Sequence, residues 1–290
     1  MKGSSLVRRL VLLAVALAPC TSLLAQGTLE RIQKRGELRI GYRKDARPLS
    51  FEENGQAAGY MVDVCRRIAD GVKERLHLAN LKLKYVPLSA ENRFDAVAKG
   101  DVDIECGATT ITMSRQERVD FSLMTFVTGG AILCRADRKI GPLTDLAGKT
   151  VAVVRGTTTA DALQAYLSKS LIDARLVLVA DRSDGMARLE RGDVDGFASD
   201  QVVLIGEARA ALEKDKSLSF SFTDDLFSFE PIALMVRRND GDFRLVVNRA
   251  LVQLFRAGAQ VDLYRTWLGD AGVGPSPMLV AMYRIQALSD

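Results

Sequence analysis

The sequence has few of the side chains on which metalloproteins and many enzymes depend. It contains one histidine, His77, four cysteines and one tryptophan in 290 residues. The spacing of Cys65, Cys106 and Cys134 suits no zinc site, and a single histidine cannot build a set of nucleophile, base and orienting group. Phosphate-binding glycine motifs are also absent. We therefore expect no metal, no cofactor and no catalytic residues.

Long apolar runs are missing except near the N-terminus. The run Leu10 to Ala18 follows three basic residues and precedes small residues that end at Ala25, a layout that predicts a secretory signal peptide over 1–25. A membrane anchor is the alternative, but the run is about half of the roughly 20 residues that cross a bilayer. A lipoprotein attached through Cys20 is a second alternative, which Pro19 disfavours. We expect a soluble, periplasmic mature protein.

Charge of one sign is also scarce. The formal net charge is +4, and subtracting the three basic residues of the predicted signal peptide leaves +1. A nearly neutral chain gives no reason to expect nucleic acid or an anionic membrane as a partner.

Three cysteines remain after the predicted cleavage, an odd number in an oxidising compartment. At least one thiol is therefore free or pairs between chains. Cys65 lies at helical spacing with Met61, Val64 and Ile68, which places it in the core rather than at a ligand. Whether Cys106 and Cys134 pair depends on whether their strands lie side by side, and spacing leaves that open.

The remaining chain alternates β-rich runs with helical patterns, which predicts an α/β fold. Its length favours two subdomains. A Gly-Asp-Val-Asp segment follows a predicted helix and enters a predicted strand at 100–103 and again at 192–195. We therefore interpret these two parts of the chain as an internal pseudo-repeat. Strands are predicted at 38–41, 81–86, 102–106, 131–134, 151–154, 175–179, 194–198 and 232–236, helices at 61–76, 93–99, 143–146, 160–167, 184–191, 243–255 and 261–267, and a surface extension at 269–277.

Two loops rich in glycine and threonine follow predicted strands, at 107–110 and 156–159. Free backbone N–H groups at such positions suit a carboxylate, and ligands of open α/β sheets gather at the carboxyl ends of strands. The alternative is that Thr158 or Thr159 only caps a helix. Arg43 follows a predicted strand, Arg93 opens a predicted helix and Arg115 follows the first threonine loop. A guanidinium at such positions can bind a carboxylate through two hydrogen bonds. For each arginine the alternative is a solvated surface position.

These segments carry a family resemblance. The segment Asp103-Ile-Glu-Cys-Gly-Ala-Thr-Thr110, with Arg115 and Phe121-Ser122, resembles the polar amino-acid binding proteins of bacterial ABC importers. Four segments, one of them within the first, make the glutamate- and aspartate-binding members of family 3 the most similar. These are Glu91-Asn92-Arg93, Glu105-Cys106-Gly107, Gly156-Thr157-Thr158 and Leu204-Ile-Gly-Glu207.

The resemblance implies a periplasmic binding protein-like type II fold, with two α/β lobes, a hinge and an interlobe ligand cleft. The hinge segments would fall near 127–131 and 229–232. Lobe one would comprise 28–128 plus 231–290, and lobe two 129–230. The implied partners are a small amino acid and the membrane permease of an ABC importer, and we expect a monomer.

The resemblance also implies residue roles. Arg115, Thr110 and Thr158 match the positions that hold the ligand α-carboxylate, and Asp200 matches the one that meets the α-ammonium. Arg43 and Arg93 match the arginines that take the second carboxylate. The predicted ligand-binding set is Arg43, Arg93, Ala108, Thr110, Arg115, Thr158, Arg182 and Asp200. Three of these arginines against one aspartate leave two positive charges in excess, which suits glutamate or aspartate.

The chain departs from this pattern within the predicted cleft. Ala90 and Ala108 replace serines, and each lost hydroxyl removes a hydrogen bond worth about 0.5–1.5 kcal/mol. Arg182 replaces a histidine, so a larger or more anionic acid is an alternative ligand. An enzyme on the same fold, similar to cyclohexadienyl dehydratase, is the alternative function, with Glu105 and Glu207 as available carboxyl groups. A ligand-sensing receptor domain is a third, disfavoured by the absence of a fused membrane or signalling segment.

Overall fold

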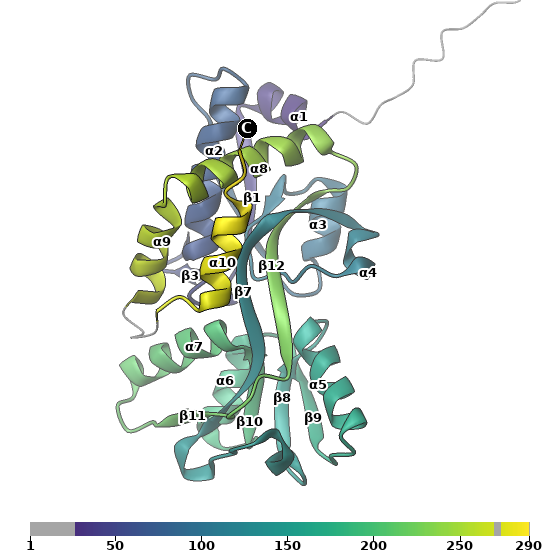
Figure 1. Ribbon diagram of the computed structural model, residues 1–290, viewed down its shortest axis with the longest axis vertical. Coiled ribbons are helices and arrows are strands. Elements are labelled where there is room, and N and C mark those ends of the chain that lie inside the picture. Colours follow the sequence, from purple (N-terminus) through teal and green to yellow (C-terminus); the bar gives the residue numbers. More distant parts are fainter. Residues whose placement is uncertain (1–26, 270–273, 290) are drawn as a thin grey trace, which may run out of the picture.

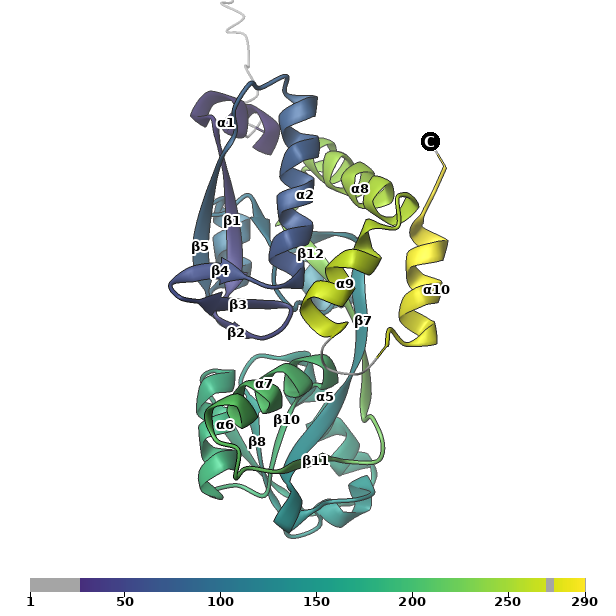
Figure 2. The same ribbon diagram turned by 90° about the vertical axis from the view of Figure 1, so that its left-hand side faces the viewer.

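Two α/β lobes lie one above the other, joined by two long strands (Figure 1). A computed structural model describes residues 27–269 and 274–289, so the predicted signal peptide lies outside the described residues. The connecting strands are β7 (Val119–Arg135) and β12 (Ser228–Arg237), which pair antiparallel and pass together from one lobe to the other (Figure 2). The predicted lobe boundaries stay predictions, and they fall within these two strands.

One nine-stranded sheet runs through both lobes, in the order β5-β1-β6-β12-β7-β10-β8-β9, with β11 paired to β7. Lobe one contributes the parallel strands β1 (Glu37–Arg43), β5 (Lys82–Leu88) and β6 (Ile104–Glu105). A separate sheet of β2 (Asp45–Ala46), β3 (Ser50–Glu53) and β4 (Gln56–Ala58) lies beside it. The helices of lobe one are α1 (Thr28–Arg35), α2 (Tyr60–Arg75), α3 (Arg93–Lys99), α4 (Met113–Gln116), α8 (Gly241–Arg256), α9 (Ala259–Leu268) and α10 (Pro277–Gln286).

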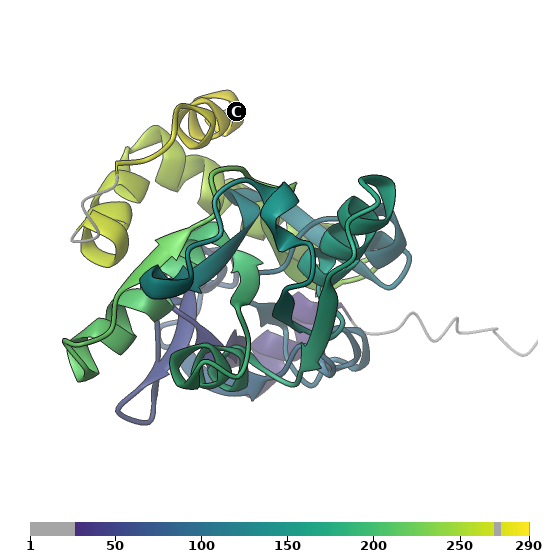
Figure 3. The same cartoon turned by 90° about the horizontal axis from the view of Figure 1, so that it is seen from below.

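Lobe two repeats the arrangement of strands followed by helices. Its strands are β8 (Thr150–Val154), β9 (Arg175–Val179), β10 (Gly196–Asp200) and β11 (Phe220–Phe222), and its helices are α5 (Thr158–Lys169), α6 (Arg182–Arg191) and α7 (Gln201–Lys214), with short 3₁₀ turns η1 (Ala136–Arg138) and η2 (Leu143–Leu146). Seen from this lobe, helices α8 to α10 gather at one side of the molecule (Figure 3). The predicted fold class is confirmed.

The Gly-Asp-Val-Asp repeat has the same structure in both lobes. Gly100 and Gly192 end α3 and α6 in the left-handed region, with φ of 77° and 76°, where glycine carries no Cβ penalty. The Asp103 carboxylate accepts a hydrogen bond from the Arg39 N–H at 2.9 Å, and that of Asp195 accepts one from the Thr150 N–H at 2.8 Å. The pseudo-repeat is therefore a repeated strand and helix unit.

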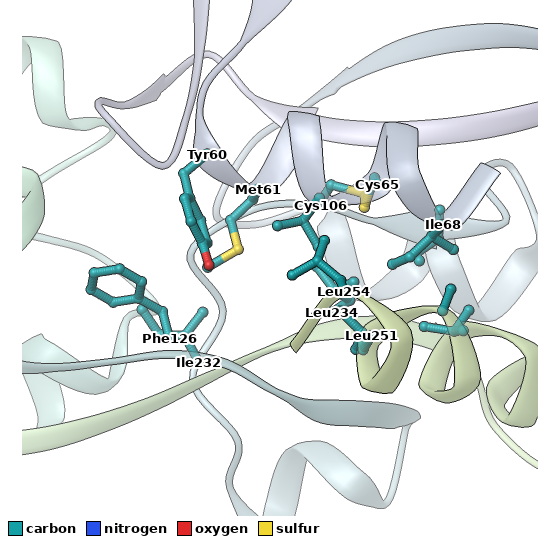
Figure 4. Close-up of a cluster of buried hydrophobic side chains, with 14 of the residues drawn as sticks. Tyr60, Met61, Cys65, Ile68, Cys106, Phe126, Ile232, Leu234, Leu251 and Leu254 are labelled. Carbon is teal, nitrogen blue, oxygen red and sulfur yellow. A yellow bond between two sulfur atoms is a disulfide. The ribbon is translucent and has the colours of Figure 1, made fainter. Parts of the chain in front are cut away.

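The core of lobe one contains the disulfide Cys65–Cys106, which joins α2 to the loop after β6 (Figure 4). Cys65 is buried in the core, as the helical spacing predicts, but as half of a disulfide. Cys134 is free and buried, so the pairing of Cys106 with Cys134 does not occur. The disulfide fixes the start of the threonine loop that follows Cys106.

The structure differs from the sequence prediction at several elements. Helix α7 is not among the predicted helices, because its first turns carry the run Val202 to Ile205, whose β-branched residues are typical of strands. Helix α10 begins at Pro277, inside the predicted surface extension, because proline is tolerated in the first helical turn. The predicted strand 102–106 is reduced to the two residues of β6. No helix among residues 27–269 and 274–289 is long and apolar enough to cross a membrane.

Candidate functional site

Three predicted arginines come together on lobe one. Arg43 is the last residue of β1, Arg93 is the first residue of α3, and Arg115 lies in α4. Arg43 and Arg93 are each 2% exposed, so neither is a solvated surface residue. The guanidinium carbons of Arg93 and Arg115 lie 4.6 and 5.3 Å from the centroid of the Phe94 ring. Cations packed this closely require nearby negative charge.

Glu105 supplies part of that charge from the end of β6. It is fully buried, and its Oε1 accepts a hydrogen bond from the Thr109 hydroxyl at 3.3 Å. Burial raises the pKa of Glu105, while Arg93 and Arg43 oppose the shift. Burial also lowers the pKa of Arg93 to about 9, and the neighbouring Arg43 adds to this effect. Gly107 is required here, because a Cβ at that position would collide with the Glu105 carboxylate.

The two threonine loops meet across the lobes at Glu230 of β12. The hydroxyls of Thr110 and Thr158 donate to Glu230 Oε2 at 2.6 and 2.7 Å, and Ser228 donates to Oε1 at 2.7 Å. Arg115 donates from Nη1 to the Thr110 carbonyl at 2.8 Å. The predicted α-carboxylate residues therefore lie together and already hold a carboxylate of the protein. Glu230 was missed by sequence reasoning, although an acidic residue within an apolar strand is a usable signal.

Helix α5 is capped by Thr157, not by Thr158 or Thr159. The Thr157 hydroxyl accepts a hydrogen bond from the Ala160 N–H at 3.2 Å, as an N-cap threonine does. The capping alternative for Thr158 is therefore wrong, and its hydroxyl points to the interlobe contact instead. Its oxygen also lies 3.1 Å from the Thr110 hydroxyl oxygen.

Asp200 and Arg182 pair with each other on lobe two. Arg182 is the first residue of α6 and Asp200 the last of β10. The Arg182 Nη2 donates to Asp200 Oδ2 at 3.2 Å, and its Nε donates to the Ser199 hydroxyl at 3.1 Å. Burial raises the pKa of Asp200, and Arg182 counteracts this. The carboxylate that the resemblance assigns to the ligand ammonium thus already has a cationic partner.

Asp45, which sequence reasoning missed, lies between Arg43 and Arg182. Arg43 Nη2 donates to its two oxygens at 2.7 and 3.1 Å. From the other lobe, the Arg182 N–H donates to Asp45 Oδ2 at 3.0 Å, and Arg182 Nη1 lies 3.8 Å from Oδ1. Asp45 follows Arg43 by two residues, a spacing that puts side chains on one side of an extended chain.

These neighbours correct the predicted charge balance. The arginines Arg43, Arg93, Arg115 and Arg182 face the carboxyl groups of Asp45, Glu105, Asp200 and Glu230. Four arginines thus face four acidic side chains, so the expected excess of two positive charges is wrong. Buried donors nevertheless outnumber buried acceptors among the unpaired atoms of the site. In the described part of the chain, Arg43 Nε, Arg93 Nε and Arg182 Nη1 have no hydrogen-bond partner, against the single acceptor Glu105 Oε2.

The two alanines of the predicted site behave differently. Ala90 is buried, and its carbonyl accepts a hydrogen bond from Arg93 Nη1. Ala108 is partly buried and packs against the core of lobe one. Within residues 27–269 and 274–289, no group of three or more His, Cys, Asp or Glu is arranged to hold a metal ion.

Comparison with known proteins gives this arrangement a context. The family model described as bacterial extracellular solute-binding proteins, family 3, matches residues 38–270. The L-glutamate/L-aspartate-binding protein of Pseudomonas aeruginosa is 31% identical over 265 residues, which cover 91% of this chain and 87% of that protein. The glutamate/aspartate import solute-binding protein of Salmonella typhimurium is 30% identical, covering 84% of this chain and 80% of that protein.

Solved structures support the same assignment. A mutant of ArgBP from T. maritima has a TM-score of 0.70 at 29% identity, covering 83% of this chain and 99% of that one. An ancestral amino acid-binding protein, described as a precursor of cyclohexadienyl dehydratase, has a TM-score of 0.69 at 28% identity, with the same two coverages of 83% and 99%. The protein therefore belongs to family 3 of the bacterial extracellular solute-binding proteins.

Proposed function

We propose that this protein captures an acidic amino acid, glutamate or aspartate, between its two lobes. The observation that carries the proposal is the buried set of arginine N–H groups without partners, on Arg93 of lobe one and Arg182 of lobe two. Buried donors are costly unless an acceptor satisfies them. A ligand with two carboxylates supplies such acceptors to both lobes at once.

The residue roles follow the geometry of the site. Arg115, Thr110 and Thr158 lie together and would take the α-carboxylate, with the two threonine hydroxyls turning from Glu230 to the ligand. Arg93 would take the second carboxylate. The ammonium would approach Asp200, beside Arg182.

Transport is the activity that the relatives' names support. The matched proteins of Pseudomonas aeruginosa and Salmonella typhimurium are named for binding or importing glutamate and aspartate. We propose that this chain works in the periplasm as a monomer, does not bind nucleic acid, and delivers its ligand to the membrane permease of an ABC importer. Binding and release, rather than bond-making chemistry, would then be its whole task.

A ligand panel measured by thermal unfolding and calorimetry tests this function. The mature protein should gain about 2.7 kcal/mol of stability at a ligand concentration of 100 times Kd, because the ligand binds only the folded state. That corresponds to a rise in Tm of about 5–11 °C for a chain of this size. The panel should contain glutamate, aspartate, their amides, arginine and simple dicarboxylic acids. No shift and no heat with any of them would contradict the proposal.

A further inference from the structure

Asp45 is a carboxylate of the protein placed where two arginines from opposite lobes converge. It accepts hydrogen bonds from Arg43 of lobe one and from the backbone N–H of Arg182 of lobe two. The side chains of Arg43, Asp45 and Arg182 are 2%, 8% and 3% exposed. This contact joins residues that are 137 positions apart in the chain, so it forms only when the lobes meet.

The contact resembles the one that a ligand carboxylate would make. One Asp45 oxygen faces Arg43 Nη2 at 2.7 Å, and the other faces the first N–H of α6 at 3.0 Å. A guanidinium and a helix N-terminus are both favourable partners of a carboxylate. Asp45 thus uses the partners that the second carboxylate of a long ligand would need.

The arginines of the site form two groups, one around the Phe94 ring and one around Asp45. Arg93 and Arg115 share the ring of Phe94, whereas Arg43 and Arg182 share Asp45. Burial lowers the pKa of Arg93 most, and the nearby charges of Arg43, Arg115 and Arg182 lower it further. Burial also lowers the pKa of Arg43 most, and the charges that act on it are those of Asp45, Arg182 and Glu105. Arg93 is therefore linked to Arg115 through the Phe94 ring and to Arg43 and Arg182 through their charges.

We propose that Asp45 is a specificity-determining residue that closes the far end of the site, so that the protein prefers aspartate to the longer glutamate. The proposal rests on the function proposed above, in which Arg115 holds the α-carboxylate. The short side chain of an aspartate ligand places its carboxylate at Arg93, whose buried Nε has no partner among the described residues. One more methylene moves that carboxylate toward Asp45, where it meets a like charge instead of an available guanidinium.

Calorimetry with L-aspartate and L-glutamate tests this on the wild type and three variants. D45N removes the charge in a nearly isosteric side chain, and D45S also frees Arg43 and Arg182 for a ligand. E37Q is the matched control, because Glu37 is paired with Arg39 at the opposite end of β1 and the variant changes the net charge equally. The quantity compared is the ratio of the two dissociation constants within each protein, which does not depend on the fraction that is folded.

The wild type and E37Q should bind aspartate at least tenfold more tightly than glutamate. D45N should reduce this preference to about threefold or less, and D45S should reverse it. If D45S does not fold, D45N decides the test. A wild type that binds glutamate as tightly as aspartate, or a ratio that D45N leaves unchanged, would overturn the inference alone. If the wild type and E37Q bind neither aspartate nor glutamate, the proposed function is overturned, and this inference is overturned with it.

Discussion

Individual arginines of the site differ in what they touch, and this separates their roles. Arg115 donates to the Thr110 carbonyl beside the threonine hydroxyls, whereas Arg93 donates to the Ala90 carbonyl and interacts with the charge of Glu105. The sequence singled out these arginines because Arg43 follows a predicted strand, Arg93 opens a predicted helix and Arg115 follows the first threonine loop, and the family resemblance placed them in one site. It could not find the Asp45–Arg182 contact, because that pairing depends on how two lobes meet.

Removing Arg115 or Arg93 should therefore change ligand affinity in different ways. We expect R115A to weaken binding of every amino acid by about 30-fold or more, because truncating one partner of a buried charge pair costs about 2–5 kcal/mol. R93A should instead lose the preference for a second carboxylate and keep measurable affinity for neutral amino acids. R118A is the control, since Arg118 also contacts Phe94 but is half exposed. Calorimetry over acidic and neutral ligands measures both effects, and equal losses for R115A and R93A would contradict the assignment.

Arg182 should matter for stability as well as for binding. Its side chain is 3% exposed and is paired with Asp200, whose carboxylate is also buried. Replacing it by glutamine leaves Asp200 without its cationic partner, whereas Asp45 keeps its hydrogen bonds from Arg43 and from the backbone N–H of residue 182. Breaking a buried pair from one side typically costs about 3–5 kcal/mol. We therefore expect R182Q to unfold at a markedly lower urea concentration than the wild type. R191Q, which breaks an exposed pair with Asp193, should change the midpoint little, and a similar loss in both variants would refute a special role for Arg182.

At the scale of elements, local patterns predicted most of the fold. The helix predicted at 93–99 and the strand predicted at 175–179 have the same bounds in the structure, because glycine punctuation and β-branched residues define them locally. Helix α7 escaped prediction because its apolar run has no clear helical period, and tertiary packing decides its conformation. Of the site, sequence could therefore give the loops and helix starts but not the ion pairs between them.

The disulfide links an element of the core to an element of the site. Cys106 directly precedes the loop that carries Thr109 and Thr110, and its partner Cys65 is anchored in α2. The bridge spans 41 residues of sequence, and removing such a bridge typically costs about 2–4 kcal/mol. The double variant C65S/C106S should therefore lower Tm by about 4–16 °C and weaken ligand binding, since the threonine loop loses its anchor. C134S is the control for a buried cysteine outside the bridge, and thermal unfolding with calorimetry measures both properties.

At the scale of the whole molecule, the lobes touch along α7 as well as at the arginines. A Cβ at Gly206 would lie 2.6 Å from the Arg47 carbonyl oxygen of lobe one, so the backbones approach closely there. Next to it, Glu207 Oε1 accepts a hydrogen bond from the Arg47 N–H at 3.3 Å. The sequence showed the Leu204 to Glu207 segment only as part of a resemblance, because the surface that it meets lies 160 positions away.

Closure of the lobes should therefore depend on pH through Glu207. Burial raises its pKa to about 7, with Arg182 and Arg47 opposing the shift and Asp45 adding to it. When the lobes separate, water reaches the carboxyl group and its pKa returns toward the ordinary value of about 4.3. The closed form thus binds a proton that the open form releases, so closure is most favourable below pH 4.3 and this contribution disappears as the pH rises through 7.

The measurable consequence is a ligand affinity that weakens by up to about tenfold between pH 6 and pH 8. Free glutamate and aspartate keep the same charge over this interval, so a change of affinity with pH would arise from a group of the protein. E207Q, which cannot ionise, should bind with an affinity that is constant over the same range and close to that of the wild type at pH 6. Calorimetry in buffers of different ionisation heat would also detect the proton taken up on closure at pH 7. An unchanged pH profile in E207Q would assign the proton to another group, whereas a flat wild-type profile would show that Glu207 stays buried when the lobes separate.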